Sequence, residues 1–283
     1  METGAAKPGH ALKAAAHRVA GGRARDDRRL REARRATFDQ VAETYERVRP
    51  GYRDRLFDDL AGLTGLGRGA RVLEIGCGTG KATIALARRG WRVTGLEPGA
   101  NLARIAVRKL ARFPNVHIEE RTFEDWRGPR AAFDLVFAAQ SFHFVDPIVG
   151  LPKVARILRP GGAFAIVSYR LRRGASATDR RVQRAYSRYA PTLAQRLGDE
   201  DPWEDRIDDS GRFGTVIQCR YRAQRRYSAA DYVALLETQS DHQLLPAARR
   251  ARLLAAIARA IRTGGGSVTL RHVTRLRVAR RRP

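Results

Sequence analysis

The chain has 283 residues, of which 55 are Lys or Arg and 29 are Asp or Glu, so its formal net charge is +26. Apolar residues make up 43% of the chain, enough to bury a sizeable core, which excludes wholesale disorder. The cysteines, Cys77 and Cys219, are too few for a disulfide scaffold. No stretch approaches the roughly 18 consecutive apolar residues of a membrane-spanning helix. We therefore expect a soluble, cytoplasmic protein.

The basic excess is almost entirely arginine, because lysine occurs at only five positions. Codon bias in a GC-rich genome produces such an imbalance, since most arginine codons are GC-rich and lysine codons are not. The basic residues are also scattered along the chain, with dense runs only at its two ends. Two interpretations stay open: a solvated basic surface, which we favour, and a binding site for a polyanion such as nucleic acid.

Residues 1–36 carry ten basic and four acidic side chains and few large apolar ones. Such a segment cannot bury enough surface to offset its ordering entropy, so we expect a flexible or partly helical basic tail. A mitochondrial presequence is disfavoured, because acidic residues interrupt the segment and serine is absent. The remainder, 37–283, is expected to form one domain with its core at 72–168.

From residue 37 onward the sequence alternates between helical and strand patterns. Apolar spacing predicts a first helix that ends at Pro50-Gly51. Alternating helices and strands of these lengths predict a parallel sheet that is covered on both faces. The next strands are expected at 71–75, 91–96, 116–118, 133–137 and 163–168, and the helices around them at 53–63, 81–89, 99–112 and 148–158.

The stretch 170–212 departs from this alternation, because it is highly charged and reads as helical. We expect an insertion over the carboxyl ends of the strands, where it acts as a lid or covers an acceptor site; the alternative is a surface excursion without function. Strands at 215–227 and 267–278, with helices between them, complete the pattern. The expected fold class is α/β: a Rossmann-like, seven-stranded, mostly parallel sheet with helices on both faces and an antiparallel last strand.

A glycine-rich loop, Gly76-Cys77-Gly78-Thr79-Gly80, follows the strand at 71–75 and opens a helix. Glycines allow a tight turn and let the backbone approach a ligand closely. A dinucleotide site requires Gly or Ala one position further on, where this chain has Lys81. The loop therefore suits a nucleoside that carries an amino-acid arm.

Acidic residues follow the second and third strands. Glu97 ends the second strand, 21 residues after Gly76, where a carboxylate can accept hydrogen bonds from both ribose hydroxyls. Glu124 and Asp125 follow the third strand beside two aromatic residues, so one acid can meet an exocyclic amine while a ring packs against the base. Together these features indicate a nucleoside site.

Three segments, Val72–Gly80, Glu97-Pro98 and Leu158–Gly162, resemble class I S-adenosylmethionine-dependent methyltransferases of the type 11 group. Residues 37–52 and 140–144 resemble a narrower subset, similar to trans-aconitate methyltransferase-like proteins. The resemblance implies a seven-stranded Rossmann-like sheet and S-adenosyl-L-methionine as the cofactor. The residues expected to bind it are Tyr45, Arg49, Glu74, Gly76, Gly78, Thr79, Gly80, Glu97, Pro98, Phe123, Glu124 and Gln140.

In that family the acid of the first strand and the glycine loop hold the methionine arm of the cofactor. The resemblance therefore implies that Glu74 and the glycine loop hold it here. The resemblance likewise implies that Phe123 and Glu124 hold the adenine. Tyr45 and Arg49 lie one helical turn apart and share a face, so Arg49 is expected to pair with a carboxylate of the cofactor or substrate. The alternative is an ordinary surface pair.

Methyl transfer from a sulfonium is an in-line displacement, so the protein mainly aligns donor and acceptor and excludes water. Gln140 is expected at the methionine end of the cofactor, with simple polar packing as the alternative. His143 is the candidate general base, because it follows strand four at the carboxyl edge of the sheet; the alternative is a packed loop histidine. We expect no metal site, since no cluster of His, Cys and Asp has ligand spacing.

The favoured function is methyl transfer to a small-molecule acceptor, with an oxygen or carboxylate as the methylated group. A nucleic-acid methyltransferase is the alternative enzyme. Residues 139–143 disfavour it, because amino-methylating enzymes of that class usually have an acid or Asn followed by Pro-Pro-aromatic there. A third alternative is a protein that binds the cofactor or a polyanion without turnover. The sequence does not fix the oligomeric state.

Overall fold

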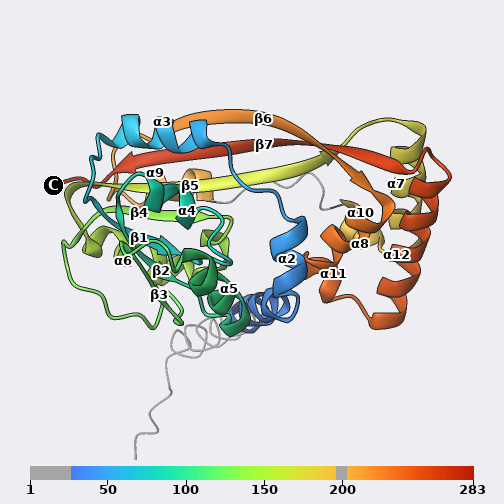
Figure 1. Cartoon of the computed structure of the whole chain (residues 1–283), viewed down its shortest axis with the longest axis horizontal. Helices are drawn as coiled ribbons and strands as arrows, with labels where there is room; N and C mark the ends of the chain where they lie inside the picture. The colour runs from blue at the N-terminus through green and yellow to red at the C-terminus, as the bar shows by residue number, and fades with distance from the viewer. Residues whose placement is uncertain (1–26, 196–202) are drawn as a thin grey trace, which may run out of the picture.

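A computed structural model describes residues 27–195 and 203–283. Seven strands form one sheet, in the order β3-β2-β1-β4-β5-β7-β6 (Figure 1). Strands β1 to β5 pair in parallel, and β7 is antiparallel to both of its neighbours. The predicted fold class is therefore confirmed. The strands are β1 Arg71–Ile75, β2 Arg92–Leu96, β3 Val116–Glu119, β4 Phe133–Ala139, β5 Leu158–Arg173, β6 Ile217–Ser228 and β7 Ser267–Arg280.

Helices surround this sheet and precede it. Residues 27–40, which include the described part of the predicted tail, are helical. Within residues 27–195 and 203–283 we find no helix with the length and apolar character that crossing a bilayer requires. The labelled helices are α2 Ala42–Val48, α3 Asp54–Thr64, α4 Thr83–Arg88, α5 Ala100–Leu110, η1 Phe142–Phe144, α6 Pro147–Ile157, α7 Ala177–Tyr189, α8 Pro191–Gln195, α9 Trp203–Asp209, α10 Ala229–Glu237, α11 Ser240–Gln243 and α12 Ala247–Arg262.

The central strand β1 is buried on both faces, which explains its continuous apolar run. Val72 on one face packs with α3 and α4, and Leu73 on the other face packs with α6 and α9. Its neighbours are β2 and β4. The carboxyl ends of these three strands therefore meet at one edge of the sheet, where β1 runs into the glycine loop.

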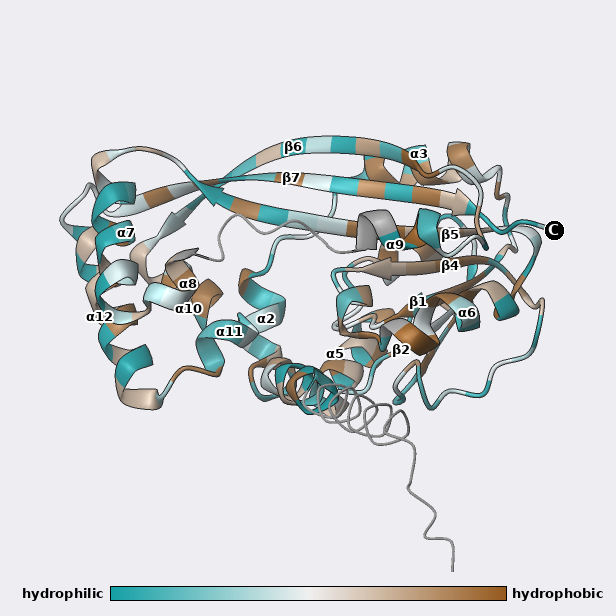
Figure 2. Cartoon of the chain, turned by 180° about the vertical axis from the view of Figure 1, so that it is seen from behind, coloured by the Kyte–Doolittle hydropathy of each residue, from teal (hydrophilic) through white to brown (hydrophobic). Residues whose placement is uncertain are grey.

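The strands β5, β6 and β7 are much longer than the others. The fifth strand, predicted to end at Ser168, continues to Arg173 because β7 pairs with it along its whole length from Ala163. The far ends of these strands carry a second apolar core together with α7, α8, α10 and α12, and α11 lies beside it (Figures 1 and 2). We call this part the distal lobe.

The predicted insertion at 170–212 thus contains the end of β5, then α7, α8 and α9. Part of it belongs to the distal lobe, whereas Ile207 of α9 packs in the core beneath the central strands. Residues 196–202 of the insertion and residues 1–26 of the tail lie outside the described residues. The function of the insertion as a lid stays a prediction.

Candidate active site

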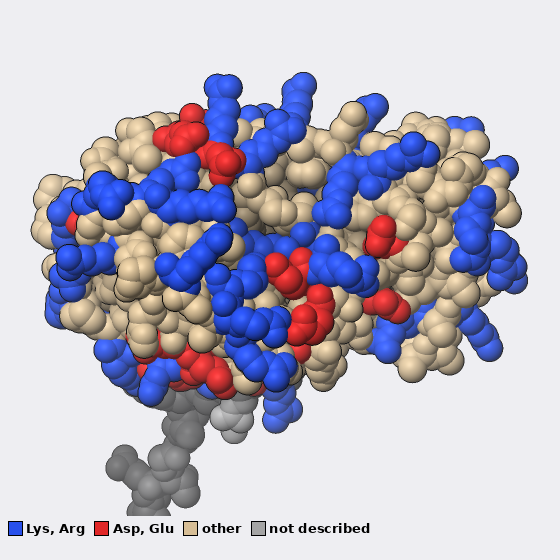
Figure 3. All heavy atoms as spheres, in the orientation of Figure 1, with Lys and Arg blue, Asp and Glu red and all other residues tan. Residues whose placement is uncertain are grey.

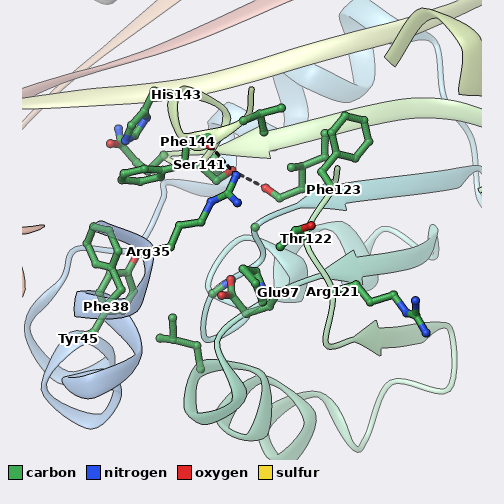
Figure 4. A pocket seen from close by; sticks show the side chains of 18 of the residues that line it. Arg35, Phe38, Tyr45, Glu97, Arg121, Thr122, Phe123, Ser141, His143 and Phe144 are labelled. Atoms are coloured by element: carbon green, nitrogen blue, oxygen red, sulfur yellow. Dashed lines mark hydrogen bonds between the residues drawn. The ribbon is translucent and has the colours of Figure 1, made fainter. Parts of the chain in front are cut away.

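A pocket lies where β1, β2 and β4 end, between the glycine loop and the N-terminal helical residues (Figure 4). It encloses about 860 Å³, counted to its open mouth. The predicted site residues on its wall are Tyr45, Arg49, Gly76, Gly78, Glu97, Pro98, Phe123, Gln140 and His143.

The glycine loop has a backbone that only glycine adopts without strain. Gly76, Gly78 and Gly80 have φ angles of +65°, +58° and +77°. A Cβ on Gly76 would also lie 2.6 Å from the Cβ of Ser141. The amide of Cys77 donates to the carbonyl of Leu96 over 3.0 Å, which ties the loop to β2. The loop therefore presents bare backbone to the pocket.

Glu97 closes the loop from the end of β2. Its Oε2 accepts a hydrogen bond from the amide of Gly78 over 2.8 Å, and its Oε1 accepts one from the amide of Gly99 over 2.9 Å. Only 6% of the residue is exposed, and this burial raises its pKa to about 7. Each carboxylate oxygen keeps further acceptor capacity, as two ribose hydroxyls would require.

Glu74 lies beneath the loop rather than on the pocket wall. The hydroxyl of Thr83 donates to its Oε2 over 2.7 Å, and burial raises its pKa to about 8. At neutral pH this carboxyl is therefore mostly protonated. The predicted residues that do not line the pocket are Glu74, Thr79, Gly80 and Glu124.

Replacing Glu74 by glutamine is expected to flatten the pH dependence of thermal stability. Because the folded pKa lies above the unfolded value, the folded protein retains a proton that the unfolded chain releases. This stabilisation is complete below the unfolded pKa and is lost as pH rises through about 8. The melting temperature of the parent protein should fall between pH 6 and pH 9, and that of Glu74→Gln should fall less. Equal falls in the two proteins would contradict the burial argument.

Phe123 lines the second end of the pocket, and the next residue, Glu124, lies behind the wall with an acceptor oxygen that is incompletely paired. Glu124 Oε1 accepts hydrogen bonds from Arg35 over 2.8 Å and from the amide of Asp146 over 2.9 Å. Its Oε2 is buried and has no hydrogen-bond partner among the described residues. An exocyclic amine next to the ring of Phe123 would satisfy this oxygen.

The N-terminal helical residues supply a wall that sequence analysis missed. Arg35 donates to Glu124 and to the carbonyl of Phe144, and Arg31 pairs with Asp146 over 2.8 Å. Phe38 packs edge-to-face on Phe144, with ring centroids 5.5 Å apart. Figure 4 shows Arg35 and Phe38 on the opposite side of the pocket from Thr122 and Glu97. Phe38 and Phe144 lie within the motifs that carried the resemblance, whereas Arg35 falls in the predicted tail.

Arg49 connects α2, the pocket and the distal lobe. Its Nε and Nη2 donate to the hydroxyl and the carbonyl of Thr238 over 2.8 and 2.7 Å, just beyond α10. Its guanidinium also lies 5.3 Å from the centre of the Tyr45 ring. Among the described residues no carboxylate lies within 4.0 Å of this cation, so it retains the capacity to bind an anion.

Gln140 and His143 lie where the chain leaves β4. Gln140 has a φ of +59°, an uncommon backbone conformation for a residue with a side chain, and its Nε2 donates to the carbonyl of Tyr169 over 3.2 Å. His143 is exposed, with its ring centroid 4.1 Å from that of Phe144. The structure thus brings the candidate base to the mouth of the pocket that Arg49 and Gln140 line.

Comparison with known proteins identifies the same region. Residues 72–162 match a family model described as a methyltransferase domain. An uncharacterized methyltransferase of Mycobacterium tuberculosis is 33% identical over 181 residues, which cover 64% of this chain and 67% of that one. The demethylmenaquinone methyltransferase of Tropheryma whipplei is 30% identical over 176 residues, covering 59% and 71% of the two chains. A solved structure from Anaeromyxobacter dehalogenans, named as a type II methyltransferase, superposes with a TM-score of 0.59 at 28% identity, covering 83% of this chain and 97% of that one.

Proposed function

This chain belongs to the class I S-adenosylmethionine-dependent methyltransferases, and on that premise we propose that it methylates a small anionic molecule on an oxygen or a carboxylate. S-adenosylmethionine supplies an activated methyl group on a sulfonium that is already a good leaving group. The chain's own residues then have to bind, align and desolvate the two partners.

The pocket has the features that this cofactor requires. The bare backbone at Gly76 and Gly78 leaves room for the methionine arm. Glu97 is held between two amides with acceptor capacity left for the ribose, and the unpaired Oε2 of Glu124 beside Phe123 suits the adenine amine. These observations support the assignment of the cofactor-binding residues, which we propose on this basis.

The proposal that the acceptor is an anion rests on the guanidinium of Arg49. Arg35 is already paired with Glu124, and the side chain of Arg121 points away from the middle of the pocket (Figure 4). Arg49 is therefore the cation on the wall that is left without a carboxylate among the described residues. A carboxylate of the acceptor or of the methionine arm would neutralise it, and a cationic cofactor adds further attraction for an anion.

With a carboxylate acceptor, methyl transfer would need no base at the pocket mouth. Carboxylates are ionised at neutral pH and attack a methyl group without losing a proton, whereas a hydroxyl needs proton removal. We propose that His143 acts as the base only if the acceptor is a hydroxyl. The distal lobe, joined to the pocket through Thr238, is the proposed cover on the acceptor side.

The test is to follow conversion of S-adenosylmethionine to its demethylated product with a panel of small mono-, di- and tricarboxylic acids, neutral alcohols and short oligonucleotides. We expect turnover with a carboxylic acid. For that acid, Arg49→Gln should raise KM or lower kcat/KM by about tenfold or more, the effect of losing a charge-assisted hydrogen bond. Turnover confined to oligonucleotides, or an Arg49→Gln variant as active as the parent, would refute the proposal.

A further inference from the structure

The ribbon of β5, β6 and β7 has two chemically different faces. Opposed residues share a face, and the pairing of these strands runs without a register shift. On one face Tyr169, Thr274 and Tyr221 are aligned, and on the other Arg170, Val273 and Arg222 are aligned. We call the second one the arginine face: Ser168, Arg170, Arg172, Arg220, Arg222, Gln224, Arg226, Thr269, Arg271, Val273 and Arg275.

The tyrosine-bearing face is largely covered. Tyr221 donates to Asp59 of α3 over 2.6 Å, and Leu171, Tyr227 and Leu270 belong to the distal-lobe core. Among the described residues, those that cover the arginine face reach only as far as Ile166, which packs with α6 and α9. Beyond that point its side chains are exposed, except for four that are half-buried, Ser168, Arg170, Val273 and Arg275. Hydrophilic residues, teal in Figure 2, alternate with hydrophobic ones along the ribbon.

The charge of this face is of one sign. Seven of its 11 positions are arginine, and β5, β6 and β7 contain no Asp or Glu at all. Arg170, Arg172, Arg220, Arg222 and Arg271 have no ion pair or hydrogen bond of their side chains within the part of the chain that the structure describes. Elsewhere basic and acidic groups lie side by side, as on the face shown in Figure 3. Random scatter of arginine codons does not explain a surface from which acids are missing.

The spacing of these arginines fits a phosphate backbone. Same-face residues on one strand are about 6.8 Å apart and neighbouring strands about 4.8 Å apart, so the guanidinium groups form a close two-dimensional array. Arginine binds phosphate oxygens through its planar fork of donors. Stacking of unpaired bases needs aromatic side chains, and the face has none, because Tyr169, Tyr221 and Tyr227 belong to the opposite face. A duplex, whose bases are already stacked, is the nucleic acid that this surface suits.

We propose that the arginine face binds the phosphate backbone of double-stranded nucleic acid, without reading its sequence. This is a docking surface and is separate from the methyl-transfer pocket. It places the enzyme on a duplex while the small-molecule reaction proceeds elsewhere on the chain.

The experiment compares two triple variants that lose the same charge. The face variant loses three exposed arginines of the arginine face, through Arg172→Gln, Arg222→Gln and Arg271→Gln. The α4–α5 variant loses three exposed arginines around α4 and α5, through Arg88→Gln, Arg104→Gln and Arg112→Gln. Fluorescence anisotropy with 20-base-pair DNA and RNA duplexes, repeated over a salt series, measures affinity and its salt slope. Calorimetry with S-adenosylmethionine measures cofactor affinity as a control for folding. Anisotropy with single strands tests whether the surface prefers a duplex.

We expect the parent and the α4–α5 variant to bind duplexes with a Kd of about 1–100 µM near physiological salt, as non-specific binders do. The face variant should bind at least tenfold more weakly, with a salt slope reduced by about 2–3.

Equal loss in both triple variants would mean diffuse electrostatics and overturn the proposal. It would also be overturned by absence of duplex binding in the parent or by stronger binding to single strands. If the face variant self-associates while its duplex affinity stays unchanged, the arginines serve to prevent pairing of β6 with another chain. That result would also overturn the proposal. Unchanged cofactor affinity in both variants shows that the fold is intact and keeps this result independent of the proposed function.

Discussion

Replacing Glu97 by alanine is expected to weaken S-adenosylmethionine binding by about 100-fold or more. A hydrogen bond to a charged group contributes about 1.5–3 kcal/mol, and the carboxylate is placed to accept two from the ribose. The substitution also frees the amides of Gly78 and Gly99, so the loop that holds the methionine arm loses its anchor. Isothermal titration calorimetry with the cofactor and with its demethylated product measures the effect.

Two controls separate the role of this carboxylate from general damage. Glu120→Ala removes an exposed acid just after β3 and should leave the affinity unchanged. Glu97→Gln keeps an acceptor oxygen but cannot ionise. The pKa of Glu97 is raised to about 7, so the affinity of the parent should increase from pH 6 to pH 8 as the carboxylate forms. The variant should lack this increase, apart from what the cofactor's own amine contributes. A Glu97→Ala protein that binds like the parent would remove Glu97 from the ribose site.

The central part of the fold could be predicted because its signals are local. The strand before Gly76 is a short apolar run, and the loop after it has glycine at each of its three positions with positive φ. Ser228 caps α10 by accepting a hydrogen bond from the amide of Asp231, three residues further on. Each of these features is determined by a few neighbouring residues.

The end of β5 could not be predicted in the same way. Residues 169–173 alternate Tyr, Arg, Leu, Arg and Arg, and their charge masks the alternation of a strand. What makes them a strand is pairing with β7, about 100 residues further along the chain, and burial of Leu171 in the distal lobe. Long-range pairing of this kind overrides local propensity.

The same limit applies to the pocket wall. Arg35 belongs to a segment that is too poor in apolar residues to predict a packed structure. It is held in place by Glu124, 89 residues away in the sequence, and by the carbonyl of Phe144. No pattern within the segment encodes these partners. Glu74, by contrast, is identifiable from its motif, but burial under the loop and a hydrogen bond from Thr83 place it away from the pocket wall.

Replacing Gly76 by alanine is expected to destabilise the protein by about 3 kcal/mol and to impair cofactor binding. The left-handed conformation costs alanine about 1–2 kcal/mol. The new methyl group would in addition lie 2.6 Å from the Cβ of Ser141, and relieving such overpacking costs about 1–3 kcal/mol more. Since Ser141 is backbone-linked to Gln140 on the pocket wall, the strain moves the loop relative to β4. Thermal unfolding and calorimetry with S-adenosylmethionine measure the two effects.

Gly65 provides the matched control, because its φ of +66° equals that of Gly76 within a degree, and a methyl group added there would have no non-adjacent atom within 4 Å. Gly65→Ala should therefore show the backbone cost alone, about 1–2 kcal/mol, with cofactor affinity unchanged. The difference between the two variants isolates the contact with Ser141. A second substitution, Ser141→Gly, removes that contact and should restore much of the stability of Gly76→Ala. If both single variants lose the same stability, or if Ser141→Gly restores nothing, the close packing of the loop against Ser141 is not what requires glycine at position 76.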